Sequence, residues 1–463
     1  MHHTWTRRDM LKALGIASAG ATVSHSTLAA LMSRPIEYSP SPLFRSPDRP
    51  VTAIVAGAGN RGNTYAPYSE KYPSELKIVG VAEPIPFRRD RFAKRYKIDP
   101  HHVFNTWEDI FKVPKFADVV IITTPDRLHY GPAMAALEMG YDLLLEKAIA
   151  QTWSQCTDIL HRAQAKNRIV AICHELRYAP FFRKIKDVID SGALGRLISI
   201  QWMEPVYNIH MSHSFVRGNW RNTAESNPML LSKCCHDLDL LSWYIGKPCT
   251  RVGSFGSLTW FRKENAPAGS PARCSDGCPV EAQCPYSALK VYRPDAGWTH
   301  VFDIPDDADK QAVILENLKK GPYGRCVYHC DNDVVDHQVV ELEFADNVTA
   351  TLSMEGHTSY GGRRVRIMGS AGDLVGDEND LSISNFKNGE TARWNVKDNA
   401  DLTSGHGGGD FALVAAFIQA VSQQNQNLLS TTIASAMESH WIGFKAEEAR
   451  AKGVIMRVGA VEE

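Results

Sequence analysis

The chain has 463 residues, of which 44% are hydrophobic and 22% charged, and its formal net charge is −1 at neutral pH. This is an ordinary globular composition, long enough for two domains with cores of their own, and it excludes a strongly basic nucleic-acid-binding or membrane-surface protein. The sequence contains no apolar run of about 18 residues, so no membrane span is expected.

The first thirty residues have the order of an export leader. Arg7 and Arg8 precede a mildly apolar stretch over residues 13–23, and small residues follow up to Ala30. This order predicts a twin-arginine signal peptide over residues 1–30, handled by the twin-arginine translocase, and a periplasmic or extracellular location. The alternative is a basic N-terminus without a targeting role. Residues 31–50 hold several prolines and serines, which predicts a linker.

A dinucleotide-binding pattern follows the linker. A short β-branched run over residues 51–56 predicts a buried strand, and residues 57–62 then complete the pattern G-x-G-x-x-G. A second strand over residues 77–82 ends at Glu83, where a carboxylate accepts hydrogen bonds from the adenosine ribose and repels a 2′-phosphate. The pattern predicts NAD as the cofactor, while Arg88 and Arg89 leave NADP as the less favoured alternative.

Strands and helices continue to alternate up to residue 175. Helices are predicted over residues 86–96, 132–140 and 152–166, and strands over residues 118–123, 141–145 and 169–173. This alternation predicts a doubly wound parallel sheet, whose ligands bind beyond the carboxyl ends of the strands. The residues expected at the cofactor are Gly57, Gly59, Asn60, Arg61, Gly62, Glu83, Thr124, Pro125, Asp126, His129, Glu146 and Lys147.

The order of these motifs resembles the Gfo/Idh/MocA oxidoreductase family. The shared features are G-x-G-x-x-G, the acidic end of the second strand, T-P-x-x-x-H at residues 124–129 and Glu146-Lys147 after the fifth strand. The resemblance runs from about residue 51 to the C-terminus, where residues 439–440 and 446–450 match the family's closing helix. The family normally has proline after the Glu-Lys pair, and Ala148 in its place should alter local rigidity while leaving Lys147 in position.

The second half of the chain has a different pattern. Strands predicted over residues 197–204, 251–260, 337–344, 348–355 and 363–368 largely follow one another without helices, which predicts a mostly antiparallel open sheet. The fold class is therefore α/β, with a Rossmann domain over residues 51–175 and a substrate-binding α+β domain over residues 176–463. Helices near residues 410–422 and 431–451 should pack back onto the fold.

Candidate catalytic residues lie on a predicted helix over residues 230–246, where His236 and Asp239 share one face. They resemble the family's H-x-x-D motif, whose histidine acts on the substrate hydroxyl, although a helix-capping or core histidine is the alternative. Ser232 stands where family dehydrogenases usually carry an aspartate, so the usual acid–base set is incomplete. The expected catalytic residues are Lys147, His236, Lys233 and Asp239.

Lys147 is expected to polarise a substrate oxygen near the nicotinamide, unless it only pairs with Glu146 or solvent. Residues 210–221 combine polar and aromatic side chains, which suits a sugar site and also a solvated loop. A glycine-rich loop over residues 405–410 either closes over the site or simply begins a helix. The expected substrate contacts are His210, His213, Arg217, Trp220 and His406.

A cysteine-rich insertion is predicted over residues 262–335. Cys274, Cys278 and Cys284 form C-x3-C-x5-C, and Cys326 and Cys330 follow in a distant segment. Three clustered cysteines and a fourth from elsewhere suit a tetrahedral structural zinc. The expected ligands are Cys274, Cys278, Cys284 and Cys330, with Cys326 as the other choice for the fourth. Disulfides after export, or free thiols, are the alternatives.

These features predict an exported NAD-dependent oxidoreductase that acts on a sugar or a sugar derivative. Because little NAD is present outside the cell, such an enzyme should hold its cofactor tightly and restore it in each cycle, for example by oxidising one substrate and reducing another. The resemblance leaves two alternatives: an NAD-dependent glycosidase, and a non-catalytic sugar-binding relative. Open sheets of this kind commonly pair, so a homo-oligomer is also expected, whereas a nucleic-acid partner is not.

Overall fold

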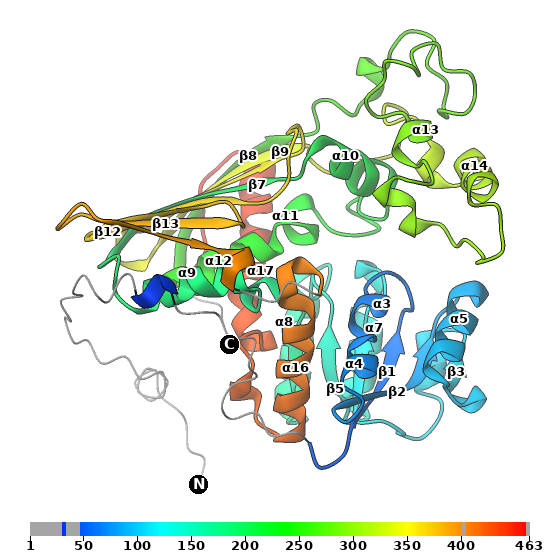
Figure 1. Ribbon diagram of the computed structural model, residues 1–463, viewed down its shortest axis with the longest axis horizontal. Coiled ribbons are helices and arrows are strands. Elements are labelled where there is room, and N and C mark those ends of the chain that lie inside the picture. The colour runs from blue at the N-terminus through cyan, green and yellow to red at the C-terminus, as the bar shows by residue number, and fades with distance from the viewer. Residues whose placement is uncertain (1–29, 34–46, 400–403, 460–463) are drawn as a thin grey trace.

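The computed structural model describes residues 30–33, 47–399 and 404–459 (Figure 1). The expected signal peptide with Arg7 and Arg8, and most of the expected linker, lie outside these described residues. Residues 30–33 form a helical turn, in which Met32 packs into the core of the second domain. Within the described ranges, no helix is long and apolar enough to cross a membrane.

The first domain is built on a six-stranded sheet in which every pairing is parallel. The strand order is β3-β2-β1-β4-β5-β6, so the order reverses beside β1, where the ligands of doubly wound sheets bind. The strands are β1 (Val51–Ala56), β2 (Leu76–Ala82), β3 (Val103–Phe104), β4 (Val119–Ile122), β5 (Asp142–Leu145) and β6 (Val170–Ile172).

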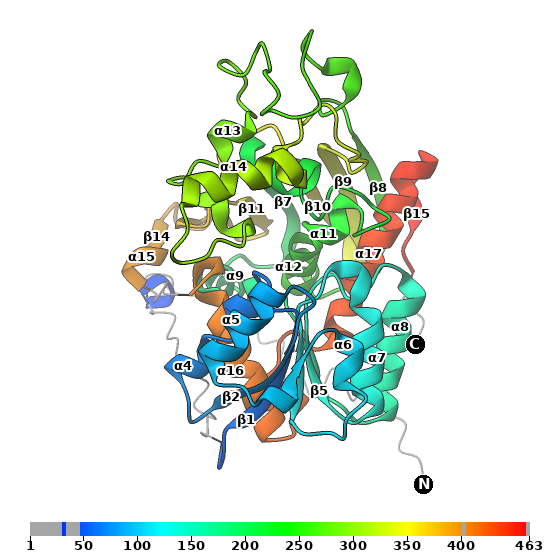
Figure 2. The ribbon, with the colours of Figure 1, turned by 90° about the vertical axis from the view of Figure 1, so that its right-hand side faces the viewer.

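Helices cover both faces of this sheet (Figures 1 and 2). They are α3 (Gly62–Tyr65), α4 (Tyr68–Lys71), α5 (Pro86–Tyr96), α6 (Trp107–Ile110), α7 (Tyr130–Glu138), α8 (Trp153–Ala165) and two late helices, α16 (Gly409–Ser422) and α17 (Ile433–Lys452). Successive side chains of β1 alternate between two cores: Val55 packs with Leu413 and Phe417 of α16, and Ile54 packs on the other face. Residues of α16, assigned from sequence to the second domain, thus complete the first.

The second domain contains a nine-stranded sheet, which is antiparallel except for the β7–β10 pair. Its order is β14-β13-β12-β11-β7-β10-β9-β8-β15, and the predicted fold class is confirmed. Four short strands, β12 to β15, were not predicted; each has six residues or fewer. The strands are β7 (Leu197–Pro205), β8 (Cys249–Ser257), β9 (His337–Phe344), β10 (Val348–Glu355), β11 (Arg364–Gly369), β12 (Gly372–Gly376), β13 (Asp380–Asn385), β14 (Thr391–Asn395) and β15 (Met456–Arg457).

Helices lie between the second sheet and the first domain (Figure 1). They are α9 (Pro180–Asp190), α11 (Met229–Ser232), α12 (Cys235–Ile245) and α17; α10 (Asn208–His210) follows β7, and α15 (Val396–Asn399) follows β14. The single helix predicted over residues 230–246 was wrong in one respect: it is broken at Lys233–Cys234 into α11 and α12. The break leaves the carbonyl of Ser232 outside helical hydrogen bonding, which matters for the site below.

The cysteine-rich insertion connects β8 to β9 and carries α13 (Ala288–Val291) and α14 (Lys310–Lys320). It has a small core of its own around Tyr292, Phe302 and Leu318. Part of it extends down to α5 of the first domain (Figures 1 and 2), where Asp303 forms an ion pair with Arg88 at 2.8 Å. The insertion therefore contacts the domain that carries the glycine-rich loop.

Candidate active site

The glycine-rich loop after β1 has the shape of a nucleotide cradle. Gly57 has a φ of +102°, and a Cβ there would lie 2.6 Å from the carbonyl oxygen of Thr123; a Cβ at Gly62 would lie 2.2 Å from that of Gly57. Both glycines are thus required by packing. At Gly59, in contrast, a Cβ would meet no atom closer than 4.0 Å. The space beside the backbone of Gly59 is therefore free of protein atoms, as the approach of a pyrophosphate to the backbone requires.

Glu83 is fixed beside this loop at the end of β2. Its carboxylate accepts hydrogen bonds from the backbone N–H groups of Ala58 (2.9 Å) and Ile85 (3.0 Å). The two nearby arginines have other partners than this carboxylate. Arg89 donates to the backbone carbonyl of Glu83, and Arg88 pairs with Asp303. The acidic group is therefore held at the place where an NAD-binding sheet presents a carboxylate to the adenosine ribose.

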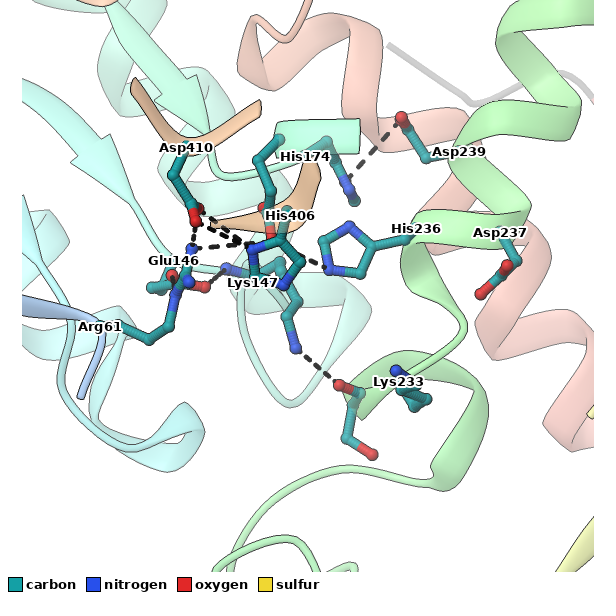
Figure 3. A network of polar contacts seen from close by, with 12 residues as sticks. Arg61, Glu146, Lys147, His174, Lys233, His236, Asp237, Asp239, His406 and Asp410 are labelled. Carbon is teal, nitrogen blue, oxygen red and sulfur yellow. Dashed lines mark hydrogen bonds and ion pairs between the residues drawn. The ribbon is translucent and has the colours of Figure 1, made fainter. Parts of the chain in front are cut away.

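A buried ionic network joins the loop to the end of β5 (Figure 3). Glu146 Oε1 accepts hydrogen bonds from Arg61 Nε (2.6 Å) and from the hydroxyl of Tyr65 (2.7 Å), and Arg61 also contacts Asp410 Oδ1 at 2.9 Å. Burial raises the pKa of Glu146, but the charges of Arg61 and Lys147 outweigh it, so the pKa lies below its ordinary value. Asn60 is exposed beside this network, at the rim of the loop.

Lys147 extends from the end of β5 toward the second domain (Figure 3). Its Nζ donates a hydrogen bond of 2.7 Å to the carbonyl of Ser232, which is free because α11 ends there, and lies 5.8 Å from the ring centre of Trp220. Burial lowers the pKa of Lys147, but Cys235 and the carboxylates of Glu146 and its neighbours raise it above its ordinary value overall. Lys147 is therefore a charged ammonium at neutral pH.

His236 lies near the start of α12 and approaches the same place from the second domain (Figure 3). Its Nε2 lies 3.7 Å from Glu175 Oε1, and its buried Nδ1 has no hydrogen-bond partner among the described residues. Burial, followed by the charge of Lys147, holds the pKa of His236 well below its ordinary value. The imidazole is therefore neutral, and one of its nitrogens is available to accept a proton.

Glu175 and His174 follow β6 directly, and the prediction from sequence missed both. Both ring nitrogens of His174 and Oε2 of Glu175 are buried without a hydrogen-bond partner among the described residues. Both could have been predicted from their position after a strand, because β6 is parallel to β5 and its carboxyl end lies at the same edge of the sheet as Glu146. Unmet polar groups concentrated in one place are a property of binding sites.

His406 joins this group from a second glycine-rich loop, residues 405–409, which leads into α16. Its Nδ1 lies 3.2 Å from Glu175 Oε1 and 3.1 Å from Asp410 Oδ2. Burial lowers the pKa of His406, but the two carboxylates raise it above its ordinary value overall. His406, predicted as a substrate contact, therefore lies beside Glu175 and Arg61 as a cationic partner of the network.

Lys233 and Asp239, which were predicted to be catalytic, have other partners. Lys233 Nζ forms an ion pair of 3.1 Å with Glu204 on β7, in a separate network with Arg363. Asp239 accepts two hydrogen bonds from Arg177, at 2.6 and 2.7 Å, and lies 3.8 Å from His174 Nε2. Sharing a helix face with His236 places Asp239 near the site, while its carboxylate anchors Arg177.

The predicted residues after β4 connect the two domains. Asp126 accepts hydrogen bonds from Trp220 Nε1 (3.1 Å), Ser226 Oγ (3.1 Å) and Asn227 Nδ2 (3.2 Å), all in the second domain. The ring nitrogens of His129 contact the carbonyl oxygens of Ala148 (2.7 Å) and Thr124 (2.9 Å), which holds the loops after β4 and β5 together. Pro125 precedes the helical turn that carries Asp126.

The predicted substrate residues separate into two groups. Trp220 and His406 reach the network around Lys147, as described. His213 forms a hydrogen bond of 2.8 Å with Tyr292 of the insertion, and His210 packs against Trp298, with ring centres 5.3 Å apart. Arg217 is fully buried and donates to the backbone carbonyls of Arg325 and Tyr286. It therefore fixes two segments of the insertion and is not exposed to a substrate.

Four cysteines of the insertion line one small cavity, namely Cys274, Cys278, Cys284 and Cys326. Cys330, named as a ligand from sequence, does not line it; its thiol donates to the carbonyl of Cys326 at 3.3 Å. All ten cysteines lie in described parts of the chain, and none of them forms a disulfide in this structure.

Comparison with known proteins identifies the family. The family model for an oxidoreductase with an NAD-binding Rossmann fold matches residues 51–174, and that for the Gfo/Idh/MocA C-terminal domain matches residues 182–375. The oxidoreductase YteT of Bacillus subtilis, named putative, is 25% identical over 67% of this chain and 73% of its own length. Inositol 2-dehydrogenase 4 of Saccharopolyspora erythraea is 24% identical over 44% of this chain and 57% of its own.

Solved structures share the fold. A levoglucosan dehydrogenase in complex with NADH and levoglucosan superimposes with a TM-score of 0.65 at 18% identity, covering 89% of this chain and all of the other. An aldose–aldose oxidoreductase from Caulobacter crescentus superimposes with a TM-score of 0.63 at 14% identity, covering 88% of this chain and all of the other. With both of its domains matched in order, the chain belongs to the Gfo/Idh/MocA oxidoreductase family.

Proposed function

We propose that this protein is an NAD-dependent oxidoreductase that acts on a sugar or a sugar derivative. The observation that carries the proposal is the meeting of charged Lys147 and neutral His236 at the carboxyl edge of the Rossmann sheet. Around them lie buried polar atoms, on His174 and Glu175, that have no hydrogen-bond partner in the part of the chain that the structure describes. This arrangement has unused hydrogen-bonding capacity for a hydroxylated substrate, which argues against a purely structural role for these residues.

The chain's own residues fit NAD. Gly59 leaves the loop open toward a pyrophosphate, and Glu83 is held where it excludes a 2′-phosphate, so NAD is preferred to NADP. Bound NAD would supply the acceptor for the hydride that leaves a carbinol carbon. Lys147 would hold the substrate oxygen by hydrogen bonding, and Nδ1 of His236 would accept the hydroxyl proton. Glu175, 3.7 Å from Nε2, would orient the imidazole and stabilise its protonated form.

The substrate class follows from the polar character of the site and from the relatives. Inositol 2-dehydrogenase, levoglucosan dehydrogenase and an aldose–aldose oxidoreductase all bear names that specify polyols or sugars. Their identity to this chain is low, so they supply the class and not the particular compound. We therefore expect a substrate with several hydroxyl groups, and a panel of inositols, anhydrosugars and aldoses is the first set to test.

The insertion supports a tightly held cofactor. Its Asp303 pairs with Arg88, and Asp306 lies 3.1 Å from Arg91, both on α5 beside the cradle. These ion pairs would hold the insertion against the side of the nucleotide cradle and so slow the loss of NAD. An exported enzyme needs such retention, because it has no external supply of NAD. Export remains a prediction from Arg7 and Arg8; replacing both with lysine should leave the precursor in the cytoplasm, and normal export of that variant would remove this part of the proposal.

A second reaction, NAD-dependent glycoside cleavage, is favoured by one feature. Position 232, where family dehydrogenases usually carry an aspartate, is a serine whose buried hydroxyl has no hydrogen-bond partner among the described residues, and Lys147 donates to the backbone carbonyl of this serine. Purified protein should therefore be assayed without added NAD on two sets of compounds. Release of phenol from aryl glycosides would assign cleavage, oxidation of free sugars with reduction of bound NAD would assign the oxidoreductase, and inactivity on both sets would contradict the proposal.

A further inference from the structure

Two distant segments of the insertion are held side by side, remote in sequence from Lys147 and His236. An isolated β-bridge pairs Arg273 with Arg325, supported by hydrogen bonds from Cys274 N to Gly324 O (3.0 Å) and from Cys326 N to Ala272 O (2.9 Å). This backbone pairing places Cys326 beside Cys274. The loop that follows Cys274 then brings Cys278 and Cys284 to the same small cavity. In this structure no three of the four sulfur atoms lie within 4.8 Å of one another, so a single zinc ion would require them to move closer together.

Arg217 lines this cavity and is fully buried. Its guanidinium lies 3.8 Å from the sulfur of Cys274 and donates to two backbone carbonyls, while its Nη1 has no hydrogen-bond partner in the described parts of the chain. No described carboxylate forms an ion pair with Arg217. Glu281, the one acidic residue on the cavity wall, is instead bonded by the hydroxyl of Ser287.

A buried cation without a counter-ion is costly, and neutral thiols do not supply one. Four thiolates around a divalent zinc ion carry a net charge of −2, and four thiolates around an oxidised cubane iron–sulfur cluster carry the same charge. Either centre would provide the negative charge that the surroundings of Arg217 lack. Disulfides between the same cysteines are uncharged and would leave Arg217 unbalanced.

We infer that Cys274, Cys278, Cys284 and Cys326 bind a thiolate-ligated metal centre, whose negative charge is partly neutralised by Arg217. The fourth ligand is Cys326 and not Cys330, because only the former lines the cavity. The centre ties together the base of the insertion, whose Asp303 reaches α5. It has no direct contact with the proposed active site, so this inference stands or falls separately from the proposed function.

The test uses the full-length chain purified without chelators. We expect either zinc in one-to-one ratio with the protein, or iron with matching acid-labile sulfide and visible absorbance; both outcomes support the inference, and they distinguish the two centres. X-ray absorption at the edge of the metal found should show sulfur ligands at about 2.3 Å. Cys326→Ser should lose most of the metal, whereas the matched Cys330→Ser variant should retain it.

Three results would overturn the inference: wild-type protein without metal, a metal with only nitrogen or oxygen ligands, or equal metal content in the two serine variants. Mass spectrometry under denaturing conditions, with thiol labelling, would then show whether the cysteines are oxidised to disulfides or free. Since the wild-type measurements alone can refute the inference, failure of Cys326→Ser to fold does not leave it undecided. Arg217→Gln provides a further check, because losing the buried positive charge should weaken metal retention while all four ligands remain.

Discussion

Replacing Lys147 with alanine should stop the chemistry without emptying the cofactor site. The ammonium is buried, charged, and bonded to the carbonyl of Ser232 at 2.7 Å, so its removal takes away the cation that we propose to hold the substrate oxygen. Loss of a positioned group of this kind costs about 10²- to 10⁴-fold in turnover, or about 3–5 kcal/mol of barrier. The carbonyl left without its partner costs about 1–3 kcal/mol of stability. Glu146 keeps Arg61 and Tyr65, so the cradle should remain formed.

The assay is the reduction of bound NAD in a single turnover after mixing with the substrate found in the sugar panel. NAD content per chain should equal that of the wild type. Lys233→Ala is the matched comparison, because this lysine pairs with Glu204 in the separate network; we expect it to affect stability more than turnover. Near-normal reduction of NAD in Lys147→Ala, or equal losses of turnover in the two variants, would refute the reasoning.

Three further predictions follow from the structure. His236→Gln should retain NAD and lose about 10²- to 10⁴-fold in turnover. Because the pKa of His236 is held low, the turnover of the wild type should not fall through protonation of this histidine between pH 8 and pH 6. A fall in wild-type turnover over this pH range that is absent in the variant would contradict this. Asp303→Asn removes an ion pair at the surface, worth about 0.2–1 kcal/mol, and should speed NAD release about 1.5- to 5-fold in a dilution assay; an unchanged rate would show that the insertion does not retain the cofactor. Asp336 lies immediately before β9 and is buried, which raises its pKa, but hydrogen bonds from His357, His337 and the backbone N–H groups of Trp260 and Thr259 lower it to about 2 overall. The ionised carboxylate of Asp336 therefore stabilises the fold fully above its ordinary pKa near 4, and this stabilisation is lost as the pH falls toward 2. Asp336→Asn should lower the free energy of unfolding in denaturant by about 2 kcal/mol at pH 7 and by less at pH 3. An equal loss at both pH values would contradict the assignment.

The parts of the molecule that sequence could predict are those in which one local pattern decides the outcome. Residues 57–62, Glu83 and Lys147 each follow directly from a strand, and a parallel sheet brings strand ends to one edge. His236 could be predicted because residues 236–239 resemble the family's H-x-x-D motif. The mostly antiparallel second sheet was predictable where apolar and polar residues alternate.

The rest depends on long-range contacts that no local pattern records. Glu175 acquires its role only because His406 and Arg61, far away in the sequence, converge on it. Arg217 was predicted as a substrate contact from its polar surroundings, and its burial against the insertion reverses that interpretation. The break after Ser232 could not be seen in the continuous helix predicted over residues 230–246, although it exposes the carbonyl that holds Lys147.

The most direct test of the central claim is to identify the nucleotide that the purified protein carries. Protein recovered from the exported fraction is incubated with each compound of the sugar panel, denatured and analysed by mass spectrometry. We expect NAD in stoichiometric amount, converted to NADH by at least one sugar when no acceptor is present. Protein without a nucleotide, protein carrying NADP, or NAD whose redox state no sugar alters and that supports no glycoside cleavage would contradict it.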